Sequence, residues 1–270
     1  MLIAWLAGVF GLLIGSFLNV CIYRLPRDLS VVAPRSFCPS CRSTIAWYDN
    51  VPLLSYLFLG GSCRHCKAPI PIRYPLIELF TGICFFAAFS RFPLYWPAVK
   101  ICVISAILIV LIVTDFEERI LPEEFTLGGT LVGLVFAVFV PLCDPILDAL
   151  PIRGAHLLSL SESALAAAIS GGTLWLIGAL YRLIRRREGL GLGDVFLMAM
   201  VGSFVGLEGA LLTIAIGSVL GSATGLVYIS VARKDSATYQ LPFGSFLGIG
   251  ALVVAFFSAT INAWYFGPGM

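Results

Sequence analysis

Two aspartates carry the clearest chemical potential of this sequence, because each lies at the edge of a long apolar run. Asp115 ends one run and Asp194 opens another. An ionisable group at the centre of a bilayer costs about 2.5–3.5 kcal/mol on insertion scales, so the few carboxylates beside such runs usually have a function. If the two side chains meet, they cannot both be ionised and would titrate as a pair that shares one proton. A shared proton over a water molecule is the arrangement of an aspartic protease.

The alternative is that both are helix-terminal charges at a membrane interface, Asp194 as an N-cap and Asp115 as a solvated end. Position alone does not decide between the two interpretations. Gly189, Gly191 and Gly193 favour the paired one, because they predict irregular backbone that is tolerated at membrane level only where protein or a wet cavity covers it. The apolar run after Asp194 is short, which fits a helix that begins in a recess.

The elements that must position these residues are membrane helices. The chain is 59% hydrophobic and 12% charged, which predicts an all-α polytopic membrane protein in contact with the lipid bilayer. Three parts are expected: a first transmembrane helix at 1–22, a loop domain at 23–74 and a multi-helix membrane domain at 75–270. About eight transmembrane helices are predicted, at residues 2–22, 75–92, 96–114, 125–142, 163–181, 194–206, 208–231 and 243–264.

The basic residues predict the orientation. No Lys or Arg precedes the first helix, whereas Arg24 and Arg27 follow it, so the N-terminus is expected outside and the following loop in the cytoplasm. With eight spans, all but three of the 17 Lys and Arg fall in cytoplasmic loops, the exceptions being Arg91, Lys100 and Arg153. Those loops are predicted at 23–74, 115–124, 182–193 and 232–242, so both aspartates lie at the cytoplasmic edge. The net charge of +2 is too small to indicate a nucleic-acid partner.

Four cysteines predict a zinc site in the first cytoplasmic loop. They form two pairs of the CxxC type, Cys38 with Cys41 and Cys63 with Cys66. Each pair can supply two thiolates to one tetrahedral ion, and a cytoplasmic location disfavours the rival disulfides. A four-cysteine site is closed and structural, so zinc is expected to fold the loop rather than to hydrolyse a substrate. The remaining cysteines are interpreted as packing residues, namely Cys21, Cys84, Cys102 and Cys143.

Other carboxylates are less informative. Glu78, one turn into the second span, either pairs with a cytoplasmic arginine such as Arg73 or has a functional role. The acidic residues expected in outer loops are Asp144, Asp148, Glu162 and Glu208.

An ordered series of motifs resembles the bacterial type IV prepilin peptidases, also called prepilin leader peptidase/N-methyltransferases. The resemblance covers most of the chain, and one such motif alone would be weak. The series is Gly15-Ser16-Phe17-Leu18-Asn19-Val20, Tyr23-Arg24-Leu25-Pro26, the four-cysteine loop with Asn50-Val51-Pro52, Arg73-Tyr74-Pro75 through Glu78, Asp115 with Leu121-Pro122, Gly191-Leu192-Gly193-Asp194, and Leu241-Pro242-Phe243-Gly244.

The resemblance implies an inner-membrane aspartic protease whose catalytic aspartates are Asp115 and Asp194. Its substrates would be type IV prepilins and pseudopilins, cleaved on the cytoplasmic side after a glycine that ends a short basic leader. It also implies methylation of the new N-terminus with S-adenosylmethionine, an activity that the zinc loop typically accompanies. No Rossmann-type glycine fingerprint follows a strand, so the methyl-donor residues are not identified.

The sequence departs from the family pattern at two positions. Phe196 stands where members often carry a lysine two residues after the second aspartate, and Glu123 stands where an aspartate commonly follows Leu-Pro. The missing lysine removes a cation that could favour an ionised Asp194.

Two other classes of function compete with the protease. A transporter could use the aspartates as ion or proton ligands, although transport sites usually lie at mid-membrane rather than at one face. A non-catalytic assembly protein with a zinc loop would need neither aspartate.

Overall fold

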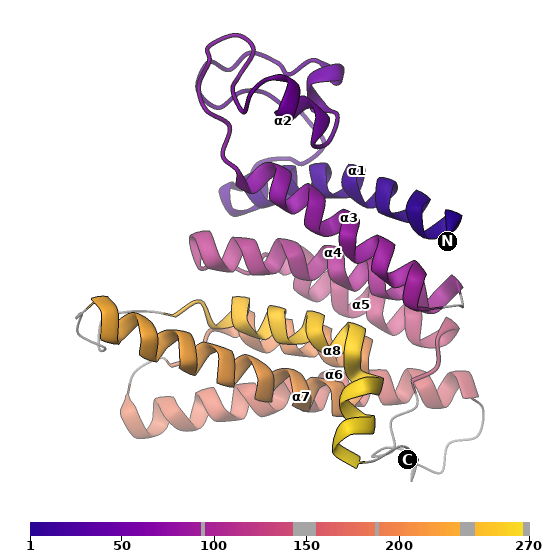
Figure 1. Cartoon of the computed structure of the whole chain (residues 1–270). Coiled ribbons are helices and arrows are strands. Elements are labelled where there is room, and N and C mark those ends of the chain that lie inside the picture. Colours follow the sequence, from indigo (N-terminus) through magenta and orange to yellow (C-terminus); the bar gives the residue numbers. More distant parts are fainter. Residues whose placement is uncertain (93–94, 143–154, 187–188, 233–240, 267–270) are drawn as a thin grey trace. The chain divides into compact units, whose positions relative to one another are not determined.

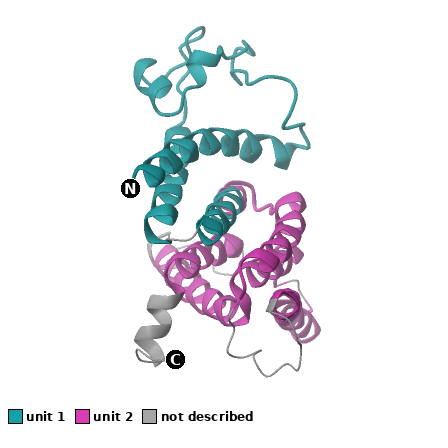
Figure 2. Ribbon diagram, turned by 90° about the vertical axis from the view of Figure 1, so that its right-hand side faces the viewer, with its two compact units in different colours: residues 1–110 teal, residues 111–270 magenta. Residues whose placement is uncertain are grey.

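The fold was analysed in a computed structural model, which describes residues 1–92, 95–142, 155–186, 189–232 and 241–266. The chain divides into two compact units, 1–110 and 111–270, and each is considered by itself (Figure 2). Several residues named above lie outside the described residues, namely Cys143, Asp144, Asp148 and Arg153.

The first unit is built on a close pair of helices, α1 (Leu2–Arg24) and α3 (Arg73–Arg91), which lie side by side (Figure 1). Glycines spaced along α1 allow this approach. A Cβ atom on Gly11 would lie 2.9 Å from the Cα atom of Gly82, and one on Gly15 would lie 2.7 Å from the Cα atom of Glu78. Small residues at such spacing are typical of helices that associate in membranes, where packing replaces the hydrophobic effect.

The chain between α1 and α3 forms a loop with little regular structure. It contains two 3-10 turns, η1 (Leu25–Arg27) and η2 (Trp47–Asn50), and a short helix, α2 (Leu54–Phe58). No strand longer than a single β-bridge occurs in the described residues, so the all-α class is confirmed for them. Hydrogen bonds attach the loop to α1: the buried Arg24 guanidinium donates to the carbonyls of Ser30 at 2.7 Å and Pro34 at 2.8 Å.

The second unit is a helical bundle centred on α7. It contains the end of α4 (Tyr95–Glu118), α5 (Glu123–Phe139), α6 (Ala155–Arg185), α7 (Leu192–Ala232) and α8 (Phe243–Phe266). Helix α7 packs against α5, α6 and α8. Serine hydroxyls join α6 to α7, since Ser163 donates to the Ser203 carbonyl at 2.7 Å and Ser170 to the Met198 carbonyl at 2.8 Å.

Helix α7 is broken at Gly206, where φ is 79° and ψ is −179°. Only glycine adopts this backbone conformation without strain. A continuous helix over Leu192–Ala232 would measure about 60 Å, twice the roughly 30 Å of a hydrocarbon core. The break falls between the predicted segments 194–206 and 208–231, and it divides α7 into two pieces.

Each of the eight predicted segments falls mainly in a helix, with residues 140–142 lying beyond the end of α5. The number of helices that cross the membrane stays a prediction. Four helical stretches of the described chain are long and apolar enough to span a bilayer: Leu2–Arg27, Tyr95–Glu118, His156–Arg185 and Leu192–Tyr228. A shorter apolar helix covers Phe243–Ser258.

Lys100 lies inside the predicted span 96–114 and is buried within α4. Two acidic residues that were expected in outer loops are instead helical. Glu162 is buried within α6, and Glu208 lies within α7 just after the break. The apolar-run pattern missed them because a helix can continue through an isolated charge that neighbouring helices cover.

Candidate functional site

Asp115 lies in the last turn of α4 and is buried, with 6% of its surface exposed. Its Oδ2 atom accepts two hydrogen bonds from one residue, the Ser245 N–H at 2.6 Å and the Ser245 hydroxyl at 2.7 Å. Ser245 is the third residue of α8, so its N–H has no acceptor inside its own helix. The Asp115 carboxylate therefore accepts a hydrogen bond from an otherwise unpaired N–H at the start of α8. The two donors of Ser245 together fix the orientation of the carboxylate.

Asp194 lies in the first turn of α7 and is partly buried. Its own N–H donates to the Gly191 carbonyl at 3.2 Å. A carboxylate in the first turn of a helix is favoured by the partial positive charge of that end. The predicted recess is consistent with this placement, in which the side chain is half-withdrawn from the surface.

The carboxyl groups of Asp115 and Asp194 both lie next to Gly244, which has no side chain to separate them. A Cβ atom on this residue would lie 3.1 Å from Asp194 Oδ1 and 3.2 Å from Asp115 Cγ. The sum of these two distances is the upper limit on the separation of those two aspartate atoms, so both side chains border one small space. The predicted convergence of Asp115 and Asp194 is thus present in the geometry, although their catalytic roles are not tested by it.

Leu121 forms the apolar side of this space. A Cβ atom on Gly193 would lie 3.1 Å from the Leu121 Cβ atom, and one on Gly244 would lie 2.9 Å from Leu121 Cδ1. Gly189 and Gly191 lie in the irregular backbone that precedes α7, whereas Gly193 lies within α7 against Leu121. A Cβ atom on Gly189 would overlap the ring of Tyr181, so this glycine also allows a close approach. The expected irregular backbone is thus confirmed at Gly189 and Gly191 and is wrong at Gly193, which is helical.

Sequence reasoning assigned no role to Gly244 and did not single out Ser245. The Leu241-Pro242-Phe243-Gly244 motif drew attention to this region, and a proline followed by an apolar run indicates a helix start. Nothing in the spacing indicates that the start of α8 meets the end of α4.

Glu78 is buried and bonds to the backbone of the loop. Its Oε2 atom accepts a hydrogen bond from the Leu53 N–H at 2.9 Å. Leu53 has φ of 59° and precedes α2, so it adopts a left-handed conformation that is uncommon for a leucine. The carboxylate therefore holds a strained turn of the loop against α3. The ion pair with Arg73 stays a prediction.

The four cysteines of the loop converge as predicted. Their sulfur atoms all lie within 4.8 Å of one another, and Cys38 Sγ is 3.8 Å from Cys66 Sγ. Tetrahedral zinc with Zn–S bonds of about 2.3 Å requires sulfur atoms about 3.8 Å apart, so the donor set fits this ion. No disulfide joins cysteines of the described chain.

The two cysteine turns repeat one backbone pattern. In the first, the Cys38 N–H donates to Ser43 and the Arg42 N–H to Cys38. In the second, the Cys63 N–H donates to Ala68 and the Lys67 N–H to Cys63. Arg42 and Lys67 have φ of 57° and 59°, and a β-bridge closes each turn. Each turn thus presents its two sulfur atoms in the same way.

The electrostatics of the cluster favour a bound cation. Hydrogen bonds with Ser43 lower the pKa of Cys41 to about 6, and hydrogen bonds from the backbone of Cys66 and then His65 lower the pKa of Cys63. The Ala68 N–H lowers the pKa of Cys66, but burial and the three neighbouring cysteines outweigh it and raise that pKa to about 11. Four thiolates this close repel one another, and a divalent cation removes that repulsion.

Comparison with known proteins shows two matching family models and several similar relatives. Residues 9–92 match the model of the bacterial peptidase A24 N-terminal domain, and residues 102–226 match that of the type IV leader peptidase family. A prepilin leader peptidase/N-methyltransferase of Myxococcus xanthus is 38% identical over 82% of this chain and 62% of its own length. A type 4 prepilin-like proteins leader peptide-processing enzyme of Escherichia coli is 35% identical over 94% of both chains. A prepilin leader peptidase/N-methyltransferase of Pseudomonas aeruginosa is 31% identical over 95% of this chain and 91% of its own length.

No solved structure matches the chain. The two family models together cover most of its length, and the relatives extend across both units. The chain therefore belongs to the bacterial type IV prepilin peptidase family.

Proposed function

We propose that this protein removes the basic leader from type IV prepilins and pseudopilins by means of an aspartate dyad, Asp115 and Asp194. The observation that carries the proposal is the approach of both carboxyl groups to Gly244. The names of the relatives support prepilins as substrates. The distribution of basic residues supports cleavage at the cytoplasmic face of the inner membrane.

In the proposed mechanism Asp115 is the ionised member and Asp194 the protonated one. Two hydrogen bonds from Ser245 stabilise negative charge on Asp115 Oδ2 and leave Oδ1 for a water molecule. Asp194 lacks the paired side-chain and backbone donors of Ser245 and lies in the weaker field of a helix start, and it is the neighbour that must be neutral when Asp115 is charged.

Hydrolysis then proceeds by general acid–base chemistry. Asp115 takes a proton from the water, whose oxygen forms a bond to the scissile carbonyl carbon, while Asp194 donates its proton to the developing oxyanion. When the tetrahedral intermediate collapses, Asp194 regains that proton, the C–N bond breaks and Asp115 passes its proton to the leaving amine. The dyad thereby returns to its starting protonation state.

The second proposed activity is methylation of the new N-terminal amine, with S-adenosylmethionine as the methyl donor. The names of the relatives support it. Zinc held by Cys38, Cys41, Cys63 and Cys66 would stabilise the loop without taking part in either reaction, because four thiolates leave no open coordination position.

The test is cleavage of a detergent-solubilised prepilin by wild type, Asp115→Asn and Asp194→Asn, with S-adenosylmethionine present and products read by mass spectrometry. Both variants are expected to lose cleavage by about 10³-fold or more while remaining inserted, since each is a member of an acting pair. The wild-type product is expected to gain one methyl group. Normal processing by either variant would contradict the aspartate dyad and favour a non-catalytic assembly protein. Proton flux into vesicles that depends on both aspartates would favour a transporter.

A further inference from the structure

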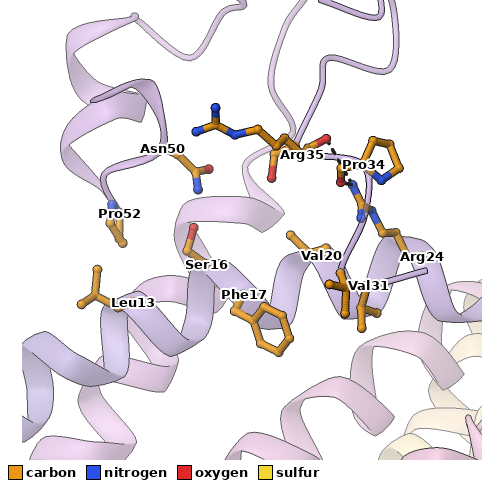
Figure 3. A pocket seen from close by; sticks show the side chains of 12 residues that line it. Leu13, Ser16, Phe17, Val20, Arg24, Val31, Pro34, Arg35, Asn50 and Pro52 are labelled. Carbon is orange, nitrogen blue, oxygen red and sulfur yellow. Dashed lines mark hydrogen bonds between the residues drawn. The ribbon is translucent and has the colours of Figure 1, made fainter. Parts of the chain in front are cut away.

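A second site lies in the first unit, where the loop covers the side of α1. It is a cavity of about 260 Å³ between α1 and loop residues 31–36 and 50–52 (Figure 3). The walls come from α1 at Leu13, Ser16, Phe17 and Val20 and from the loop at Val31, Pro34, Arg35, Asn50 and Pro52.

The two sides of this cavity differ in polarity. Leu13 and Phe17 are about half exposed and belong to the candidate membrane span Leu2–Arg27. On the opposite side, Asn50 points toward Ser16 and the Arg35 side chain extends above them (Figure 3). One side therefore suits a hydrocarbon chain, and the other suits a polar or anionic group.

The two arginines that line the cavity, Arg24 and Arg35, differ in their contacts. Arg24 is buried, and its hydrogen bonds to the carbonyls of Ser30 and Pro34 fix the loop wall. Arg35 is exposed, and its guanidinium makes no ion pair within the ranges that the structure describes. Arg35 is thus the group available to an anion, and guanidinium forms paired hydrogen bonds to phosphate.

The volume of the cavity limits the size of the group that it can enclose. A space of 260 Å³ equals about nine water molecules, and it is below the roughly 300–1,000 Å³ of pockets that enclose a whole drug-sized ligand. A glycerophosphate head group fits this space, and its acyl chains would continue along the exposed apolar surface of α1. That surface extends beyond Phe17 and Leu13 through Phe10, Val9, Leu6 and Trp5, all of them exposed.

The outer surface of the loop independently indicates contact with lipid. Val32 is 88% exposed and Phe58 86% exposed, and Trp47 and Leu57 are also largely exposed. The loop follows directly on the candidate membrane span Leu2–Arg27, so it is held close to the membrane that this helix would enter. Exposed aromatic and aliphatic side chains beside basic ones are characteristic of a membrane interface.

We propose that this cavity binds the head group of an anionic glycerophospholipid, with the phosphate at Arg35 and Asn50 and an acyl chain along Leu13 and Phe17. The site is separate from the aspartate pair and does not rest on the proposed peptidase activity. Its ligand comes from the bilayer rather than from the cytosol.

The test titrates dioleoyl phosphatidylglycerol into the full-length protein in detergent and counts bound lipids by native mass spectrometry. Arg35→Gln is expected to weaken the tightest lipid about tenfold, because one charge-assisted contact is lost. Arg27→Gln removes the same charge from an exposed residue of the loop that does not line the cavity, and it is expected to leave binding within twofold. Equal weakening by both variants would mean general surface attraction and would overturn the proposal.

Two further arms complete the test. Glycerol 3-phosphate is expected not to displace the lipid, because it lacks the acyl chain; displacement that depends on Arg35 would assign the cavity to a soluble phosphate and overturn the lipid assignment. Zinc content is measured for each variant. If Arg35→Gln loses zinc, Asn50→Ala takes its place, and unchanged lipid binding by that variant would also contradict the proposal.

Discussion

The cysteine cluster and the aspartate pair gather their groups over very different lengths of chain. The four sulfur donors lie within residues 38–66, and each pair is shaped by a turn of its own. The two carboxyl groups come from opposite kinds of helix end, the last turn of α4 and the first turn of α7, and the start of α8 holds them in register. The position of the four cysteines is therefore set by the local backbone of two turns. The position of the two aspartates is set by how the helices of the bundle pack.

This difference predicts that each site can be damaged without the other. The cysteines belong to the unit 1–110 and the aspartates to the unit 111–270. A local site depends on its ligands, and a packed site depends on the residues that set the helix positions. The variants below separate the two.

Cys38→Ser is expected to have the largest effect. It removes one thiolate from the proposed zinc ion, whose binding supplies the folding free energy of a loop with little core of its own. Zinc content should fall from one ion per chain to none and methyl transfer should be lost, while prepilin cleavage stays within about threefold. Metal analysis and mass spectrometry of the product measure both.

Cys84→Ala is the matched control, because this buried thiol lies in α3 away from the cluster. It should retain zinc and both activities. Intact methylation by zinc-free Cys38→Ser would contradict a structural role of the metal, and a joint loss of cleavage would contradict the separation of the two sites.

Gly244→Ala tests the packed site. Its methyl group would lie 2.9 Å from Leu121 Cδ1 and little more than 3 Å from both carboxyl groups, so these groups must shift to admit it. Because a displacement of catalytic groups by about an ångström costs about 10²-fold in rate, a loss of up to that size in cleavage is expected, with zinc unchanged. Gly128→Ala is the control, because a Cβ atom there meets nothing within 4 Å. Full cleavage by Gly244→Ala would mean that the observed approach is not the catalytic geometry.

The sequence predicted the local site better than the packed one for a physical reason. Two CxxC pairs specify ligand, geometry and ion within a short stretch, and the structure brings all four together. The identity of Asp115 and Asp194 as candidates followed from their position beside apolar runs. The contribution of Gly244 and Ser245 could not be read in the same way, because it depends on how α8 meets α4. Buried Glu162 was assigned to an outer loop for a similar reason, since its environment is set by other helices.

Ser245→Ala should have a smaller effect on the packed site. It removes the hydroxyl donor to Asp115 Oδ2 but retains the N–H donor at 2.6 Å, so the carboxylate keeps one of its two bonds. A hydrogen bond to a charged group contributes about 1.5–3 kcal/mol, which predicts a roughly tenfold to hundredfold fall in kcat with KM little changed. Ser245→Thr restores the hydroxyl and should recover most of the rate. Equal loss in both variants would indicate disturbed packing rather than a lost donor.

Glu78→Gln is expected to have the smallest effect, and it tests whether the metal site is purely local. The amide oxygen can still accept the Leu53 N–H bond, but it carries no charge, so the turn before α2 is held less firmly. Zinc should still bind at one ion per chain, and its release to a chelator should be a few-fold faster, because a neutral acceptor forms a weaker bond than a carboxylate. Cleavage should be unchanged. Glu78→Ala removes the acceptor altogether and should accelerate release further. Identical release rates for wild type and both variants would show that the cysteine turns hold the ion without support from α3, which would make the contrast with the aspartate pair sharper still.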